Sequence, residues 1–142
     1  TLDNYIDLKS GAAGSHATII TTDSTITPEN PIIVPHLWEG LFKNGIYGEN
    51  GLCNNFEIRN IHIKCMNDDG TDSGTLKQNG GGICRDYFGK GMNSDDNLIE
   101  NCSFQGNIGN YAGGVCGRAC GYSGGKGITT KQKLLKLENS LI

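Results

Sequence analysis

The sequence has few of the features that mark a membrane-spanning or nucleic-acid-binding protein. It contains 142 residues and only three prolines, and its longest apolar run is "PIIV" with "HLW" close behind. A transmembrane helix needs about 20 predominantly apolar residues, so this run is far too short. Lys and Arg number 12 against 15 Asp and Glu, and the two signs are interspersed. We therefore expect no membrane span and no nucleic-acid partner, because the chain has no basic surface to attract a polyanion.

Motifs for catalysis and metal binding are also missing. No GxSxG, P-loop or HExxH motif occurs. None of the six cysteines forms a CxxC pair, which disfavours a structural zinc site. The acidic stretch "NDDGTD" at 67–72 resembles a calcium loop, but the twelfth position from Asn67 holds Gln78 where an EF-hand requires Glu. We interpret this stretch as a solvated turn.

Paired carboxylates for cleaving a polysaccharide could come from Asp86, Asp95 and Asp96. These residues lie in a turn sequence rather than along one strand face beside Arg or Lys. We therefore predict that the chain is not an enzyme and has no catalytic residue, no cofactor and no metal site.

Glycine, in contrast, is abundant and regularly placed. The 22 glycines are about twice the usual share of roughly 7%. Many of them fall in a series of motifs, "NGIYG" at 44–48, "GGICR" at 81–85 and "GGVCG" at 113–117. The step from Ile46 to Ile83 is 37 residues, and the step from Ile83 to Val115 is 32. Self-similarity at such a period indicates a repeat architecture, in which each unit buries its apolar face by stacking on its neighbours.

A second series alternates with the first and contains an Asn in each copy. Its copies are "IRNIHI", "IENCSF" and "LENSLI", which begin 41 and then 38 residues apart. Apolar positions spaced by three and then two fit two short strands with a bend at the Asn, a residue that tolerates the left-handed conformation. Stacked copies are then expected to form a ladder of Asn60, Asn101 and Asn139, with a spacing of about 4.8 Å. The predicted stacked core is Ile46, Ile83, Val115, Ile58, Ile99 and Leu137.

The two ends of the chain fit the repeat less well. Residues 1–37 are rich in Thr and Ile and are broken by three prolines, so we predict an N-terminal strand or cap segment followed by repeats over 38–142. The tail "KQKLLKLENSLI" fits either a helix or a strand, and we expect a strand because the repeat requires one there. The alternation also predicts that His62 points outward. Because the chain opens on Thr1 and ends within a repeat, we expect a processed chain or a fragment.

Cys84 and Cys116 occupy equivalent places in successive repeats. Neighbouring strands are about 4.8 Å apart, inside the usual Cα–Cα range of a disulfide, so a bond between coils is one option. Two stacked free thiols acting as small apolar residues are the other.

The stretches "NGGGICRDYFGKG" and "NLIENCSFQGNIGNYAGGVCGRACGYSGG" carry a resemblance to known families. They resemble the Gly/Asn-rich repeat proteins encoded by giant DNA viruses of amoebae. The pair "FQGN" and "GGVC" is also similar to repeats in chlamydial polymorphic outer-membrane passengers. Both resemblances imply an all-β fold, a right-handed parallel β-helix (solenoid) of a few coils, covering about residues 38–142. "RDYFG" departs from the giant-virus pattern in the first unit.

The giant-virus resemblance implies a non-enzymatic structural protein of a virus particle, located in the virion as a capsid-associated, fibre or surface component. Its expected partners are other capsid or surface proteins, or further copies of itself. An adhesin-like passenger at the cell surface is one alternative. A small carbohydrate-binding or carbohydrate-active module is another, and it would be supported if Trp38, Tyr87, Phe88, Tyr111 and Tyr122 formed an exposed aromatic row.

Overall fold

The described part of the chain is built only from short strands and turns. The computed structural model describes residues 4–8, 18–44, 56–91, 97–121 and 129–131, and no helix occurs among them. In chain order the strands are β1 (Ile6–Asp7), β2 (Thr18–Thr21), β3 (Ile32–Val34), β4 (Phe42–Lys43), β5 (Phe56–Arg59), β6 (His62–Cys65), β7 (Leu98–Glu100), β8 (Ser103–Gln105) and β9 (Thr129–Lys131). The expectation of an all-β protein is therefore confirmed for these residues.

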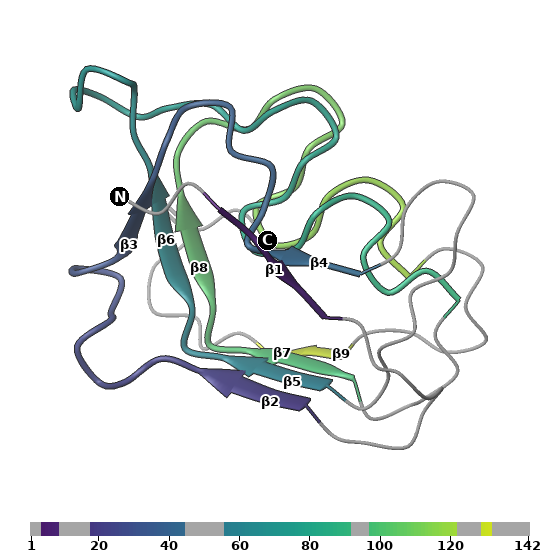
Figure 1. Ribbon diagram of the computed structural model, residues 1–142. Helices are drawn as coiled ribbons and strands as arrows, with labels where there is room; N and C mark the ends of the chain where they lie inside the picture. Colours follow the sequence, from purple (N-terminus) through teal and green to yellow (C-terminus); the bar gives the residue numbers. More distant parts are fainter. Residues whose placement is uncertain (1–3, 9–17, 45–55, 92–96, 122–128, 132–142) are drawn as a thin grey trace.

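All pairings between these strands are parallel, and they form three small sheets (Figure 1). The largest has the order β2-β5-β7-β9, the second β3-β6-β8, and the third consists of β1 and β4. The chain runs through these sheets repeatedly, and we call each run through them a pass. Each later strand pairs with the strand that the preceding pass contributes to the same sheet. In the largest sheet, Ile20 lies beside Ile58, Ile58 beside Ile99, and Ile99 beside Thr130.

The glycine motifs continue the third sheet through isolated parallel bridges. Phe42 of β4 pairs with Cys84, and Cys84 pairs with Cys116. Gly81 pairs with Gly113 in the same manner. Cys84 donates its backbone N–H to the carbonyl of Val115 at 2.8 Å, and Phe42 donates to the carbonyl of Ile83 at 2.9 Å. The two glycine motifs thus lie directly side by side, as their similarity suggests.

Asparagine bends separate the first two sheets. Asn60 lies between β5 and β6, and Asn101 lies between β7 and β8. Their φ angles are 57° and 51°, so both occupy the left-handed region. Asn enters this region at lower cost than most residues, because its short polar side chain hydrogen-bonds nearby backbone. The chain therefore turns from one sheet into the next at the residue type that the sequence repeats.

The core lies between the sheets. Phe56 and Ile58 of β5 are buried while their neighbours Glu57 and Arg59 are partly exposed, which is the alternation expected of a strand with one inward face. Phe56 packs edge-on against Phe88 with ring centroids 5.1 Å apart. The largest fully buried side chains are Phe42, Phe56, Phe88, Phe104, Ile58, Ile63, Leu76, Ile83, Ile99, Val34 and Asn44.

The N-terminal segment supplies strands, whereas the pairing of the glycine series differs from the sequence-based expectation. The strands β1, β2 and β3 pair with β4, β5 and β6, so residues 1–37 contribute strands to the same three sheets. The backbone N–H of Leu41 donates to the carbonyl of Ile83 at 2.8 Å, so Leu41 occupies the place expected for Ile46. Ile46 itself lies outside the described residues.

At the C-terminal end of the asparagine series, Thr130 pairs with Ile99 in the place expected for Leu137. The step from Ile99 to its partner is therefore 31 residues, not 38. Leu137, Asn139 and the predicted strand of the tail lie outside the described residues.

The expectation that His62 is a surface residue is wrong. Its exposed fraction is 3%. Gln105 of the neighbouring strand β8 donates its side-chain N–H to the carbonyl of Pro28 at 2.6 Å, which anchors the loop of residues 22–31 against the outside of this sheet. The loop covers a surface that alternation alone assigns to solvent.

The described part of the chain contains no apolar helix of a length that could cross a bilayer.

Candidate functional site: a polar ladder and a thiol cluster

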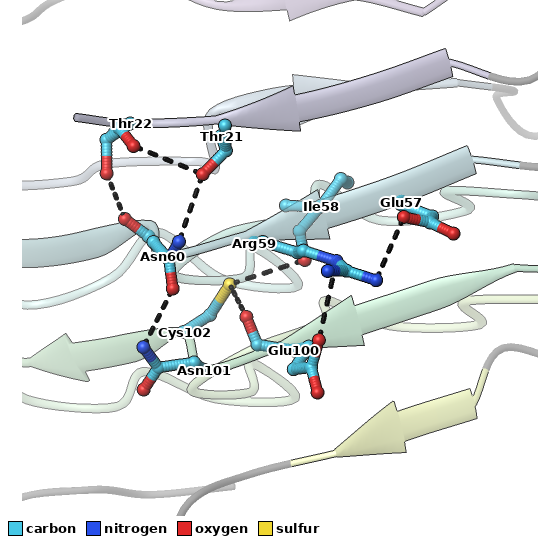
Figure 2. A network of polar contacts seen from close by, with 9 residues as sticks. All are labelled: Thr21, Thr22, Glu57, Ile58, Arg59, Asn60, Glu100, Asn101 and Cys102. Carbon is cyan, nitrogen blue, oxygen red and sulfur yellow. Dashed lines mark hydrogen bonds and ion pairs between the residues drawn. The ribbon is translucent and has the colours of Figure 1, made fainter. Parts of the chain in front are cut away.

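A ladder of hydrogen bonds runs across the strand ends at the asparagine bends (Figure 2). Asn101 donates its side-chain Nδ2–H to Oδ1 of Asn60 at 2.8 Å. Asn60 in turn donates its Nδ2–H to Oγ1 of Thr21 at 3.1 Å, and the hydroxyl of Thr22 donates to the carbonyl oxygen of Asn60. Because Thr21 pairs with Arg59, Thr22 stands where later passes have Asn. The predicted contact between Asn60 and Asn101 is present, and threonines extend the ladder in the other direction.

A row of charges follows the outer face of the same strands. Arg59 contacts Glu57 through Nη2 at 3.0 Å and Glu100 through Nε at 3.4 Å. The Arg59 side chain is 41% exposed, and exposed ion pairs contribute only about 0–1 kcal/mol. The row therefore fixes strand register weakly and does not resemble a catalytic arrangement.

A thiol cluster lies beneath the glycine motifs. Cys84 and Cys116 are direct partners across the parallel bridge, as predicted. Cys116 shares thiol hydrogen bonds with Cys84 on one side and with Cys120 on the other. Cys84 is fully buried, while Cys116 and Cys120 are partly exposed and pack against the core. Cys84, Cys116 and Cys120 are free thiols in the structure.

The hydrogen bonds within the cluster differentiate its thiols. Bonds from Cys120 and Cys84 hold the pKa of the Cys116 thiol well below its ordinary value, against the opposing effect of burial. The pKa of Cys84 is raised well above the ordinary value, chiefly by burial, and that of Cys120 is raised chiefly by its hydrogen bond to Cys116. Cys116 is therefore the member of the cluster that loses its proton first.

Cys102 and Cys65 behave as buried apolar residues. Burial raises the pKa of Cys102 to about 11, and its Sγ lies 3.5 Å from the carbonyl oxygen of Glu100. Burial also raises the pKa of Cys65, whose Sγ donates to the carbonyl of Pro35 at 3.2 Å. These thiols are poor nucleophiles because the thiolate is the reactive form.

Sequence reasoning missed the part that Cys120 takes in the cluster. A signal for it was present, because "GGICRDYFG" aligns with "GGVCGRACG" and places Cys120 opposite Phe88. The structure agrees with this alignment, since Gly121 donates its backbone N–H to the carbonyl of Phe88 at 2.8 Å. The small thiol of Cys120 thus takes, in the later pass, the place that the buried ring of Phe88 has in the earlier one, on the inner side of the turn.

The acidic candidates do not form a site. Oδ1 of Asp69 accepts hydrogen bonds from the backbone N–H of Thr71 at 2.9 Å and from its hydroxyl at 2.7 Å, and these bonds lower the pKa of Asp69. This is the local turn that the sequence predicts. Asp86 lies 3.6 Å from Arg118, and both side chains are substantially exposed. Asp95 and Asp96 lie outside the described residues, and within the described ranges no three His, Cys, Asp or Glu side chains are placed to hold a metal ion.

The candidate aromatic residues do not form an exposed row. Trp38, Tyr87 and Phe88 have exposed fractions of 3%, 9% and 0%, and the Trp38 indole N–H donates to the carbonyl of Gly82 at 3.1 Å. Tyr111 is 77% exposed, while Tyr122 lies outside the described residues. Of the candidate aromatic residues that the structure describes, Trp38, Tyr87 and Phe88 therefore belong to the core, and Tyr111 does not.

Comparisons with known proteins give no relative for this chain: no family model, no curated protein and no solved structure matches it.

Proposed function

We propose that the chain forms a right-handed parallel β-helix and acts as a non-enzymatic structural component of a virus particle. The observation that carries the fold is the repeated parallel pairing, in which each of the three sheets receives strands from successive passes. The paired asparagines and the paired glycine motifs support it, because like residues lie beside like in adjacent passes.

A structural role is supported by the polar groups, which bond to one another within the chain. The asparagine ladder, the charged row around Arg59 and the turn at Asp69 all satisfy groups within the chain itself. A stack of this kind has open ends whose strand edges need a cap or a partner. The partners that we propose are other capsid or surface proteins, or another copy of the chain at one end of the stack. The viral part of the proposal comes from the resemblance of the glycine and asparagine motifs.

The test is to raise antibodies against the purified chain and to label particles isolated from the organism that encodes it. We expect gold label on intact particles and peptides of the chain in their mass spectra. Absence from purified particles, with label on cell surfaces, would replace the viral proposal by the adhesin alternative. A glycan array and a reducing-sugar assay on the same protein address the carbohydrate alternative, and turnover that is lost on Asp86→Asn would overturn the non-enzymatic assignment.

A further inference from the structure

Cys84 and Cys116 belong to one column of paired residues in successive passes. Phe42 pairs with Cys84, and Cys84 pairs with Cys116, through parallel bridges. Phe42 and Cys84 are fully buried, while Cys116 is partly exposed and packs against the core. Directly paired residues of parallel strands place their side chains on the same face of the sheet. The two thiols therefore face the same interior, one directly beside the other.

The backbone holds this pair in register on both sides. Cys84 donates its N–H to the carbonyl of Val115 at 2.8 Å, and Gly117 donates its N–H to the carbonyl of Cys84 at 3.0 Å. Neighbouring strands are about 4.8 Å apart, which lies inside the Cα–Cα range of about 4.4–6.8 Å for disulfides. Within the described ranges, no other two cysteines are joined by a strand pairing or a bridge.

We propose that Cys84 and Cys116 are oxidised to a disulfide by exchange with a low-molecular-weight disulfide such as glutathione disulfide, and that this bond cross-links successive passes. The two free thiols of the structure are the reduced state of the pair. The proposal is independent of the viral role, because it follows from the pairing of these two residues. Disulfides prefer Cβ atoms about 3.5–4.5 Å apart, so the passes must approach each other slightly, and such strain makes the bond easier to reduce. We therefore expect the cross-link to be reversible.

The exchange proceeds in two balanced steps. Cys116 is the partly exposed member of the pair, so the reagent meets it first. Its thiolate attacks one sulfur of glutathione disulfide, the reagent's S–S bond breaks, and one glutathione leaves as a thiolate that takes up a proton from solvent. The sulfur of Cys84 then attacks Sγ of Cys116, and the second glutathione leaves with the proton that Cys84 gives up. Two protein thiols are oxidised, and one glutathione disulfide is reduced to two thiols.

Cys120 is the competing partner for Cys116, from which it is separated by a turn. This turn is tied to the preceding pass, because Gly121 donates its backbone N–H to the carbonyl of Phe88 at 2.8 Å. A bond between Cys116 and Cys120 would have to close within this tied turn. A bond between Cys84 and Cys116 joins residues that the backbone already places opposite each other.

Trypsin separates the competing pairings, because Arg85 and Arg118 each follow one of the paired cysteines. The full chain is incubated with excess glutathione disulfide, its remaining thiols are alkylated under denaturing conditions, and the tryptic peptides are read without reduction. We expect the peptide of residues 78–85 to be linked to that of residues 91–118, with the bond assigned to Cys116 by fragmentation. A link from residues 91–118 to residues 119–126, or alkylated Cys84 and Cys116, would overturn the proposal.

Three single variants test the assigned roles. Cys84→Ser is expected to stop after the first step and to accumulate a glutathione adduct on Cys116. The matched controls Cys102→Ser and Cys120→Ser are expected to retain the link at the wild-type level. Loss of the link in Cys120→Ser, or an adduct that persists on Cys116 in the wild type, contradicts the proposal. Circular dichroism of each variant checks that the fold is retained.

The cross-link itself is tested by stability. A disulfide restricts the unfolded chain, so the oxidised wild type should have a higher urea midpoint than the same sample with excess phosphine reductant. The double variant Cys84→Ser/Cys116→Ser should have the same midpoint with and without reductant. A wild-type midpoint that does not depend on reductant would show that the bond does not hold the passes together.

Discussion

At the scale of single residues, the bend asparagines combine two functions. Each adopts a left-handed backbone conformation and each places its side-chain amide in the ladder, where Asn101 donates to Asn60. Glycine could adopt the same backbone conformation but cannot supply the amide. This double demand explains why the sequence repeats Asn at the bend while its neighbours vary.

Substitutions of Asn101 separate these two contributions. Asn101→Gly keeps the backbone conformation and removes the hydrogen bond to Asn60, so we expect a loss of about 1 kcal/mol in the free energy of unfolding. Asn101→Ala removes the same hydrogen bond and places in the left-handed region a residue without the short polar side chain that makes this conformation tolerable, which raises the loss to about 2–3 kcal/mol. Urea denaturation monitored by circular dichroism measures both. Equal losses for the two variants would show that the bend carries no backbone strain.

His62 is expected to make the stability of the protein depend on pH. Burial lowers the pKa of His62, which the charge of Glu29 opposes in part, and Nδ1 lies 2.7 Å from the Ser103 hydroxyl oxygen. The unfolded chain then binds a proton more readily than the folded chain does. The stabilisation is therefore complete above the unfolded pKa of about 6.5 and is lost as the pH falls below it.

We expect the urea midpoint to fall between about pH 7.5 and about pH 5.5, a range that spans the unfolded pKa of His62. The variant His62→Gln should show a flatter dependence over the same range. Above about pH 7.5 the contribution of His62 to the wild-type midpoint should be constant, since His62 is neutral in both states. A dependence that is as steep in the variant as in the wild type would assign the effect to other groups.

At the scale of elements, the glycine motifs are required because backbones approach closely. A Cβ built at Gly81 would lie 2.0 Å from the carbonyl oxygen of Cys84, and one at Gly113 would lie 2.1 Å from that of Cys116. Both contacts are with backbone, which cannot move aside without disturbing the pairing of the two motifs. The same close approach recurs in successive passes.

The variant Gly81→Ala is expected to lose more than about 3 kcal/mol in the free energy of unfolding, or to fail to fold, because the added methyl group overlaps backbone. Gly70→Ala is the matched control. Gly70 has a φ of 75°, but a Cβ there would meet no atom within 4 Å. It should lose only about 1–2 kcal/mol from backbone strain. Similar losses for the two variants, compared by urea denaturation, would show that close approach is not what the motif requires.

Much of this local structure could be predicted from the sequence, including the pairing of Ile58 with Ile99, whereas the register of the outer passes could not. The strand–Asn–strand unit at Ile58 and Ile99 has a distinctive spacing, and the "GGIC" and "GGVC" copies are nearly identical. The preceding copy was assigned to Ile46 because "NGIYG" resembles them, but "GLF" at 40–42 is the segment that pairs. Connecting loops of different length move the repeat by several residues, so similarity alone does not select the paired position.

The tail and His62 show two further limits of sequence reasoning. Thr130, and not the expected Leu137, pairs with Ile99. The sequence gives no sign of this, because no Asn follows two residues after Thr130. Pairing within a sheet depends on the backbone more than on residue type. His62 is buried by a loop from a distant part of the chain, a tertiary contact that the alternation of a single strand does not reveal.

At the scale of the whole molecule, the first pass of the chain protects the strands that follow it. The strands β2 and β3 pair with β5 and β6, and β1 pairs with β4. Without this pass, β4, β5 and β6 would become the sheet edges in place of β1, β2 and β3, and the core would lose Leu8 and Val34. Exposed edges of this kind promote association between chains.

Deletion of residues 1–37 is therefore expected to convert the protein into larger species. Size-exclusion chromatography with light scattering should show an increase in mass, together with a lower thermal midpoint. Deletion of residues 1–8, which removes only β1, is the control and should have a smaller effect, since β5 and β6 keep their partners. A monomeric deletion of residues 1–37 with wild-type stability would contradict the protective role of the first pass.

The loop of residues 66–74, which follows β6, has a consequence for the sequence variation that the molecule can accept. Met66 and Ser73 form an antiparallel bridge, and Gly74 donates its backbone N–H to the carbonyl of Cys65 at 2.9 Å, so a narrow neck closes the turn around Asp69. Doubling the length of a closed loop costs only about 0.6 kcal/mol. The tip of this loop can therefore accept foreign peptides or natural variation while the scaffold below the neck is unaltered, which makes it a natural display position.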